Sequence, residues 1–275
     1  MTAALEKESQ LLDWLSRQPS VLVGFSGGVD SAYLACVAHE ALGSARALAV
    51  IGKSASYPAE QWAAARAVAA QAGLQVLETD THEMEDARYA ANPTDRCYFC
   101  KSELWNVLGR IAAQRGIATI VDGTNADDLA DYRPGARAAR EHGVRSPLAD
   151  AGLTKSEIRQ LSERRGIPTW SQPSSPCLSS RLPYGTPVTA ERLGQVERAE
   201  RALRALGIEG DLRVRHHGEL ARVELSPTLL DEWLRPARAR AIRDAVRGAG
   251  FARVAIDLRG FRSGSLNVLA GVGAS

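Results

Sequence analysis

One stretch of the sequence, Ser26-Gly27-Gly28-Val29-Asp30-Ser31, has the residue types and order of a phosphate-binding loop. It directly follows the apolar run SVLVGF, which is typical of a buried strand, and directly precedes a helical pattern. Glycines permit a tight turn, the backbone N–H groups of that turn converge on an anion, and the helix N-terminus adds partial positive charge. The lysine of a Walker A loop is missing. The stretch therefore predicts a phosphate site of another kind, in preference to a glycine-rich turn without a ligand.

A second polar turn follows the strand-like run ATIVDG and consists of Gly123, Thr124, Asn125, Ala126, Asp127 and Asp128. Aspartates at such a junction are commonly simple helix caps. Because the carboxyl ends of parallel strands meet at one edge of a sheet, this turn can also face the same crevice as the glycine-rich loop. Two carboxylates beside a phosphate site favour magnesium bound with a nucleotide.

Three of the four cysteines occupy positions that suit chemistry. Cys97 and Cys100 form a CxxC pair after residues 92–95, which have the composition of a loop and cap. We expect both thiols in the first turn of a helix, where the helix dipole lowers a thiol pKa. Cys177 is flanked by proline, serine and arginine, the surroundings of a reactive thiol. Cys36 lies in the apolar stretch AYLACVA and is expected in the core.

The CxxC pair can be a disulfide, a metal ligand, a redox pair or two packed side chains. No apolar run approaches the ~20 residues that span a bilayer, so we expect a cytoplasmic protein without membrane contact. Cytoplasmic thiols are kept reduced, which disfavours a disulfide. Three thiolates with no fourth ligand are too few for a closed zinc site. They suit an iron–sulfur cluster with one open iron.

The order of apolar runs predicts two domains. The strand-like runs SVLVGF, ARALAVIG, LQVLETD and ATIVDG alternate with helical patterns, which indicates an α/β domain with a parallel sheet over residues 1–170. This alternation stops at IPTWSQPSSPCLSSRLPYGTPVT. A helix, the runs DLRVRHH and LARVELS, another helix and FARVAIDL follow, and predict a smaller α+β domain over residues 171–275 that includes the Cys177 linker. The end of the tail FRSGSLNVLAGVGAS is expected to fray.

The charged residues give little sign of a nucleic-acid partner. The formal net charge is only +2, and four of the 34 basic residues are lysines, namely Lys7, Lys53, Lys101 and Lys155. No lysine-rich stripe or RNA-binding module is visible, so nucleic acid is not expected as a partner. Arg213 and Arg215 alternate along a strand-like run and should share one face. That face either binds an anion or is simply solvated.

The glycine-rich loop resembles that of the PP-loop ATP pyrophosphatases, which include GMP synthetase, NAD synthetase and tRNA thiolases. A narrower resemblance is to the LarE family, PP-loop sulfur transferases that help to build the nickel-pincer nucleotide cofactor of lactate racemase. It extends in order over nearly the whole chain, through SGGVDS, NPTDRCYFCKSEL, DGTNADDLADYRPG, SPLADAGLTKSEIR, PCLSSRLPYGTPVT and RVRHHGELARVE. By resemblance, Mg²⁺ and ATP bind at Ser26, Gly27, Gly28, Asp30, Ser31, Gly123, Thr124 and Asp127.

The LarE resemblance also implies a reaction. The enzyme would adenylylate a carboxylate of pyridinium-3,5-biscarboxylic acid mononucleotide, release pyrophosphate and form a thiocarboxylate, with Asp30 and Cys177 as catalytic residues. Sulfur would come from Cys177, which becomes dehydroalanine, or from a sulfide source through a [4Fe-4S] cluster on Cys97, Cys100 and Cys177. The presence of all three cysteines favours the cluster. The substrate would meet Arg181, Glu200, Arg213 and Arg215, with Ser180 nearby.

The resemblance further implies a homo-oligomer. Two other functions remain open from the sequence: a tRNA thiolase with the same adenylylating loop, and a regulatory module that binds ATP without turnover. Pyrophosphate release with each candidate acceptor would distinguish them.

Overall fold

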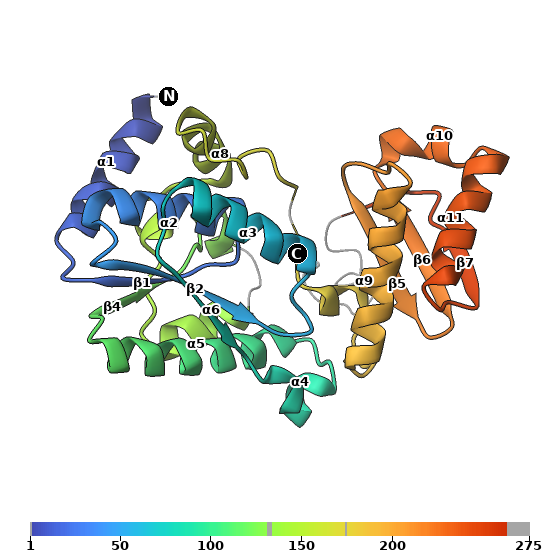
Figure 1. Cartoon of the computed structure of the whole chain (residues 1–275), viewed down its shortest axis with the longest axis horizontal. Helices are drawn as coiled ribbons and strands as arrows, with labels where there is room; N and C mark the ends of the chain where they lie inside the picture. The colour runs from blue at the N-terminus through green and yellow to red at the C-terminus, as the bar shows by residue number, and fades with distance from the viewer. Residues whose placement is uncertain (1, 131–133, 174, 263–275) are drawn as a thin grey trace. The chain divides into compact units, whose positions relative to one another are not determined.

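The computed structural model describes residues 2–130, 134–173 and 175–262 (Figure 1). The chain divides into two compact units. Unit 1 consists of Met1–Asp86 and Asp95–Ser175, and unit 2 of Ala87–Thr94 and Pro176–Ser275. The sequence analysis drew the division after residue 170 and assigned residues 87–94 to the first domain. The tail expected to fray lies outside the described residues from position 263 onward.

Unit 1 contains a four-stranded sheet in the order β3-β2-β1-β4, with every neighbouring pair parallel. Its strands are β1 (Val21–Gly24), β2 (Ala47–Lys53), β3 (Val76–Asp80) and β4 (Thr119–Val121). The chain runs outward from β1 through β2 to β3 and then returns to the other side of β1 with β4. The carboxyl ends of β1 and β4 therefore flank the point where the strand order reverses, which is where open α/β sheets bind ligands.

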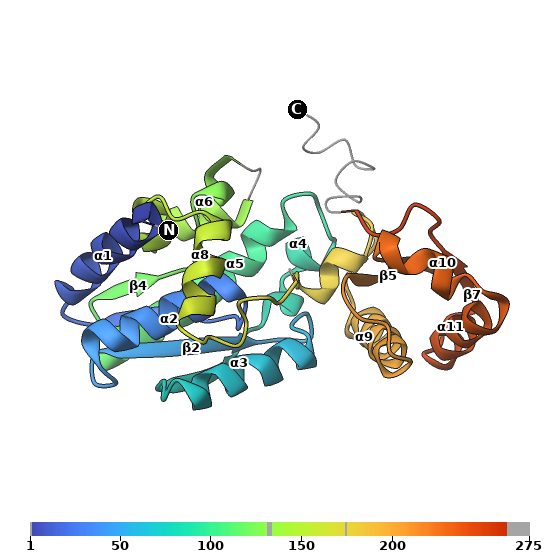
Figure 2. The ribbon, with the colours of Figure 1, turned by 90° about the horizontal axis from the view of Figure 1, so that it is seen from above.

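The helices of unit 1 cover both faces of its sheet, as predicted for an α/β domain (Figures 1 and 2). α2 and α3 lie over one face, with α1 and α8 beside α2, and α5 and α6 lie over the other. The bounds are α1 Thr2–Ser16, α2 Val29–Leu42, α3 Ala59–Gln71, α5 Arg96–Arg115, α6 Pro134–Glu141, α7 Pro147–Asp150 and α8 Lys155–Arg164. Two 3₁₀ turns, Glu83–Glu85 and Asp127–Ala130, complete the unit.

The strands of unit 1 are apolar because both of their faces are buried. Val21 and Val23 of β1 belong to the core beneath α2, while Leu22 between them belongs to the core on the α5 side. β2 alternates in the same way. Continuous apolar runs such as SVLV are typical of parallel strands covered on both sides.

Unit 2 contains a three-stranded sheet in the order β5-β6-β7. β5 (Leu212–His217) and β6 (Leu220–Leu225) form an antiparallel hairpin, and β7 (Arg253–Ile256) pairs with β6 in parallel. The helices are α4 Ala87–Ala90, α9 Ala190–Ala205, α10 Leu230–Trp233 and α11 Pro236–Gly248, with 3₁₀ turns at Leu178–Arg181 and Pro227–Leu229. α9 and α11 lie over the same face of the sheet (Figure 2).

Residues 87–94 are held inside unit 2 by Asn92, which lies in the loop that the sequence analysis expected before α5. Asn92 is fully buried, with a left-handed φ of 57°. Its side-chain amide donates to the carbonyl oxygens of Pro183 and Thr186, both at 2.8 Å. Asparagine tolerates the left-handed region better than most residues, so its type fits this anchoring position.

None of the helices within the described ranges has the length and apolarity needed to span a bilayer.

Candidate functional site

The glycine-rich loop of unit 1 is fixed by its two serines. The hydroxyl of Ser31 accepts a hydrogen bond from the Ser26 backbone N–H at 3.2 Å and lies 3.1 Å from the Ser26 hydroxyl. It also donates to the carbonyl oxygen of Gly28 at 3.1 Å. Gly27 has a φ of 70°, and a Cβ there would lie 2.5 Å from the Cβ of Ala65. The turn thus requires glycine and is held before any ligand binds.

Two residues that the sequence analysis missed orient this loop. The Tyr57 hydroxyl and the Gln61 side-chain amide both donate to the carbonyl oxygen of Ser26 at 2.9 Å. In a trans peptide the C=O and the following N–H point in opposite directions. The two contacts therefore also fix the direction of the Gly27 N–H. The sequence could have indicated them by their position after β2, at the same edge of the sheet as the glycine-rich loop.

The second polar turn, residues 123–128, packs directly on the glycine-rich loop. A Cβ at Gly123 would lie 2.9 Å from the backbone nitrogen of Ser31, so only glycine allows this approach. Thr124 donates its hydroxyl to Asp122 at 2.9 Å and its N–H to the same carboxylate at 3.1 Å. Ser146 also donates to Asp122, at 2.8 Å. Asp122, which was not predicted as a site residue, holds this turn together and joins it to Ser146.

Asp30 and Asp127 both contact Lys155, the first residue of α8. The Lys155 ammonium forms an ion pair with Oδ2 of Asp30. The Lys155 backbone N–H donates to Oδ2 of Asp127 at 2.8 Å, so this aspartate satisfies a donor at a helix start. The other oxygen of Asp30, Oδ1, is buried and has no hydrogen-bond partner among the described residues. A carboxylate oxygen of this kind suits Mg²⁺, which prefers oxygen ligands.

Two open hollows in unit 1, of about 480 and 510 Å³, contain none of the predicted site residues. They are lined by residues from the opposite ends of the strands, such as Ser20, Ala47 and Thr119. The predicted nucleotide site is therefore described by its loop geometry and not by either of these hollows.

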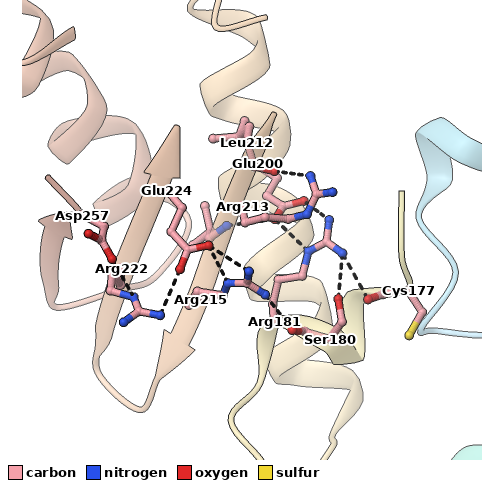
Figure 3. Close-up of polar contacts among 11 residues, drawn as sticks. Cys177, Ser180, Arg181, Glu200, Leu212, Arg213, Arg215, Arg222, Glu224 and Asp257 are labelled. Carbon is pink, nitrogen blue, oxygen red and sulfur yellow. Dashed lines mark hydrogen bonds and ion pairs between the residues drawn. The ribbon is translucent and has the colours of Figure 1, made fainter. Parts of the chain in front are cut away.

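Unit 2 brings together a buried group of charged side chains, here called the arginine cluster (Figure 3). It consists of Arg181, Glu200, Arg213, Arg215, Arg222, Glu224 and Asp257. Arg181 is 2% exposed and donates two hydrogen bonds to Glu200, at 3.0 and 2.9 Å. Glu200 also accepts from the backbone N–H of Val214 on β5, at 2.9 Å. Residues from the Cys177 linker, α9 and β5 thus meet at this cluster.

Arg213 and Arg215 are not on a solvated strand face. They are 4% and 6% exposed and project from the same side of β5 (Figure 3). Arg215 contacts Glu224 at 2.9 and 2.8 Å and donates to the carbonyl oxygen of Ser180 at 2.9 Å. The alternative of a solvated face is therefore wrong. Sequence alternation predicted the shared face but could not show that the linker contacts it through Ser180.

The guanidinium of Arg213 lies 4.9 Å from the Phe261 ring centroid and donates to the carbonyl oxygen of Leu212 at 2.7 Å. Burial and, to a smaller extent, the charge of the neighbouring Arg181 lower the pKa of Arg213 to about 10. The cluster holds more guanidinium groups than carboxylates. Such a buried excess of positive charge favours an anion.

Arg215→Ala is expected to lower the free energy of unfolding by about 3–5 kcal/mol, because it removes one partner of a buried ion pair. Glu224, at 1% exposure, would lose this partner and keep its contact with Arg222. Arg238→Ala is the matched control, since its pair with Glu232 is half exposed and should contribute less than about 1 kcal/mol. Denaturant unfolding curves measure both. If both variants lost equally little unfolding free energy, the Arg215 pair would not be needed for folding.

The four cysteines are thiols in different surroundings. Cys36 packs against the core of unit 1, and burial raises its pKa to about 11, so it is poorly suited to react. Cys97 is exposed in the first turn of α5, as expected, but Cys100 opens the second turn and is half-buried. Cys177 is half-buried at the start of the 3₁₀ turn Leu178–Arg181. Arg181 contacts the carbonyl oxygen of Cys177, at 3.2 Å, and not its sulfur (Figure 3).

The predicted cluster ligands are divided between the units, with Cys97 and Cys100 in unit 1 and Cys177 in unit 2. Within the described part of the chain, no three His, Cys, Asp or Glu side chains are grouped so as to hold a metal ion. Each unit alone supplies at most two of the three thiols. The iron–sulfur cluster stays a prediction.

The similarities to known proteins are consistent with the glycine-rich loop and with the α/β fold. A family model described as NAD synthase matches residues 12–106, which include the glycine-rich loop. An uncharacterised protein of Synechocystis is 42% identical over 97% of this chain and 98% of its own length. The pyridinium-3,5-bisthiocarboxylic acid mononucleotide synthase of Lactiplantibacillus plantarum is 34% identical over 97% of this chain and 96% of its own length.

A more distant similarity is to a probable tRNA sulfurtransferase of Methanobrevibacter smithii, 28% identical over 45% of this chain and 32% of that protein. It covers neither chain fully, whereas the similarity to the synthase extends through both units. The chain therefore belongs to the LarE family of PP-loop proteins and is an ATP-using enzyme.

Proposed function

We propose that the enzyme is an ATP-dependent sulfur transferase that acts on pyridinium-3,5-biscarboxylic acid mononucleotide, in biosynthesis of the nickel-pincer nucleotide cofactor. The observation that carries this proposal is the 34% identity to the bisthiocarboxylic acid mononucleotide synthase over nearly the full length of both chains. A relative that matched only unit 1 would have supported ATP use alone.

Adenylylation would take place at the glycine-rich loop. A substrate carboxylate oxygen attacks the α-phosphorus of ATP, the bond to the β-phosphate oxygen breaks, and pyrophosphate leaves. The fixed turn from Ser26 to Ser31 and the start of α2 would hold the departing pyrophosphate through backbone N–H groups. Asp30 would hold Mg²⁺, which shields phosphate charge. This step converts the substrate carboxylate, which is a poor electrophile, into a reactive acyl-adenylate.

The arginine cluster would bind the phosphate of the mononucleotide. Its buried guanidinium groups exceed its carboxylates, and Arg213 lies beside Arg181. Arginine is well suited to phosphate because its planar fork donates two parallel hydrogen bonds. Arg181 and Glu200 are paired with each other and would position the site.

Arg213→Gln tests this phosphate assignment. It removes the charge but keeps a polar side chain, so we expect substrate affinity to fall by about 1.5–3 kcal/mol, the range of a charge-assisted hydrogen bond. ATP affinity should be unchanged, because the glycine-rich loop belongs to unit 1. Equilibrium titration measures both. Unchanged affinity for the mononucleotide would mean that Arg213 has only a structural role.

Sulfur transfer would follow on the acyl-adenylate. A sulfur nucleophile attacks the carbonyl carbon, the bond to the AMP oxygen breaks, and AMP leaves with its electron pair. Cys97, Cys100 and Cys177 would hold a [4Fe-4S] cluster whose open iron supplies a site for sulfide. Thiols are the usual ligands of such clusters, whereas the fourth cysteine, Cys36, packs against the core of unit 1.

Pyrophosphate release tests the function. The purified full chain should release pyrophosphate from ATP when the biscarboxylate mononucleotide is present and should form a thiocarboxylate when sulfide is added. Release that depends on a tRNA and ignores the mononucleotide would contradict the proposal. ATP binding without release under either condition would instead favour a regulatory module.

A further inference from the structure

The peptide unit that joins Ser26 to Gly27 carries a hydrogen-bonded oxygen and an unused N–H. Its carbonyl oxygen accepts from the Tyr57 hydroxyl and from the Gln61 amide, both at 2.9 Å. Its N–H belongs to Gly27, which is buried, and has no hydrogen-bond partner among the described residues. A buried donor without a partner lowers stability unless a ligand satisfies it. The glycine-rich loop thus contains a free donor whose direction depends on this one peptide unit.

The backbone alone does not fix that direction. Turning the peptide unit over would reverse the sign of φ at Gly27, now 70°, and glycine adopts positive and negative φ about equally well. The carbonyl oxygen would then point where the Gly27 N–H points now. There it would be attracted by the partial positive charge of the α2 N-terminus. The loop could therefore bind its own carbonyl oxygen in the place of a phosphate oxygen.

Tyr57 and Gln61 come from one well-supported segment. The Tyr57 backbone N–H donates to the carbonyl oxygen of Ser54 at 3.1 Å, directly before α3. Gln61 and Ala65 are four positions apart and share a face of α3, and Ala65 is the residue that a Cβ at Gly27 would meet. The face of α3 that packs on the loop therefore also carries the Gln61 donor.

Satisfying the Ser26 carbonyl is a weak reason for these two contacts. Both lie at solvent-exposed atoms, so water could serve the same oxygen equally well. Water, however, follows a carbonyl in any direction, whereas two donors fixed on a helix and the turn before it accept only one. The two side chains thus select an orientation of the peptide unit.

We propose that Tyr57 and Gln61 are positioning residues of the ATP site, an assignment that rests on the proposed function. They hold the peptide unit from Ser26 to Gly27 so that the Gly27 N–H faces the pyrophosphate. One neutral hydrogen bond shifts an equilibrium by about 2–10-fold. Either donor alone keeps much of the loop in the binding orientation. Loss of both makes that orientation a minor state, and the apparent affinity falls with its population.

Tyr57→Phe, Gln61→Met and the double variant are titrated as full chains with pyrophosphate, a nonhydrolysable ATP analogue and AMP, all with Mg²⁺. Each single variant should bind pyrophosphate within about twofold of the wild-type chain. The double variant should bind it about 10-fold or more weakly, beyond the roughly fourfold loss that two independent effects would give. The ATP analogue should follow pyrophosphate, and AMP should stay within about twofold.

The matched control is Tyr98→Phe combined with Gln71→Met, which removes the same two chemical groups elsewhere in unit 1. The Tyr98 hydroxyl donates to Glu141, and the Gln71 amide donates to the carbonyl oxygen of Gly166. This control should bind all three ligands like the wild-type chain. Different losses for pyrophosphate and AMP in the Tyr57 and Gln61 double variant then cannot come from the general removal of polar groups.

The ¹⁵N resonance of the Gly27 amide reports the orientation of the peptide unit directly. In the ligand-free chain it should move furthest in the double variant. Saturating pyrophosphate should return it towards its position in the wild-type complex, because the ligand selects the binding orientation. A side chain that only supports the fold would not give this reversible shift.

Unchanged pyrophosphate affinity in the double variant, or losses that simply multiply, would overturn the assignment alone if the wild-type chain binds normally. An equal loss for pyrophosphate and AMP would also overturn it, because the two side chains would then only support the fold. A wild-type chain that binds neither pyrophosphate nor the ATP analogue would overturn this assignment and the proposed function together.

Discussion

Asp30→Asn should slow pyrophosphate release by about 10²–10³-fold, the range seen when one preorganised electrostatic contact with a reacting group is lost. Asp30 lies in the first turn of α2, with Oδ2 on Lys155 and Oδ1 buried without a partner among the described residues. Asparagine keeps the shape of the side chain but has no charge to attract Mg²⁺. A coupled assay for pyrophosphate measures the rate.

The fold of Asp30→Asn should remain intact, with a change in unfolding free energy within about 1 kcal/mol, because the pair with Lys155 is partly exposed. Asp150→Asn is the matched control in the same unit, since Asp150 pairs with Arg145 at 3.1 Å away from the loop. Its rate should equal that of the wild-type chain. A normal rate in Asp30→Asn would contradict adenylylation at this loop.

Replacing Cys97, Cys100 or Cys177 with alanine should abolish repeated thiocarboxylate formation. The physical reason is that a cluster with one open iron needs all three thiolates. Anaerobically reconstituted wild-type chain should be brown and, with added sulfide, should make more than one thiocarboxylate per chain. Pyrophosphate release should continue in each variant, because the thiols take no part in adenylylation. Cys36→Ala is the control and should keep the colour and the turnover, since Cys36 packs against the core.

Intact mass after turnover distinguishes the two sulfur sources. If Cys177 gives up its own sulfur, each chain turns over once, loses the elements of hydrogen sulfide and keeps dehydroalanine at that position. A cluster that relays added sulfide leaves Cys177 at full mass. Dehydroalanine at position 177 in reconstituted protein would contradict the cluster, and Cys97 and Cys100 would then need another explanation.

The sequence predicted the parts of the molecule that depend on local pattern. The strands and helices of unit 1 follow the apolar runs closely, and the parallel sheet was expected from their alternation. The placement of Cys36 against the core was also confirmed, because an apolar helical stretch leaves little choice of surroundings. The start of α5 beside Cys97 followed from the composition before it.

The parts that depend on distant segments were not predicted. Tyr57 and Gln61 lie far along the chain from the carbonyl oxygen that they hold, and Lys155 is separated from Asp30 by 125 positions. The burial of Arg215 depends on Glu224 from β6 and on Ser180 from the linker. Local periodicity carries no information about such partners. The burial of Asn92 was not predicted for the same reason, since its partner Pro183 follows 91 positions later.

The assignment of residues 87–94 to unit 2 constrains the order in which parts of the chain can fold during synthesis. Asn92 leaves the ribosome 91 positions before Pro183, its hydrogen-bond partner. At about 5–20 residues per second, this segment waits roughly 5–20 seconds for its partners to be synthesised. Tyr89, which is 1% exposed in the folded protein, lacks its hydrogen-bond partner Ser179 during that interval. During this interval, unit 1 contains residues 87–94 as a loop that has not yet met its partners in unit 2. A nascent chain stalled before Pro183 would therefore expose this segment to proteases.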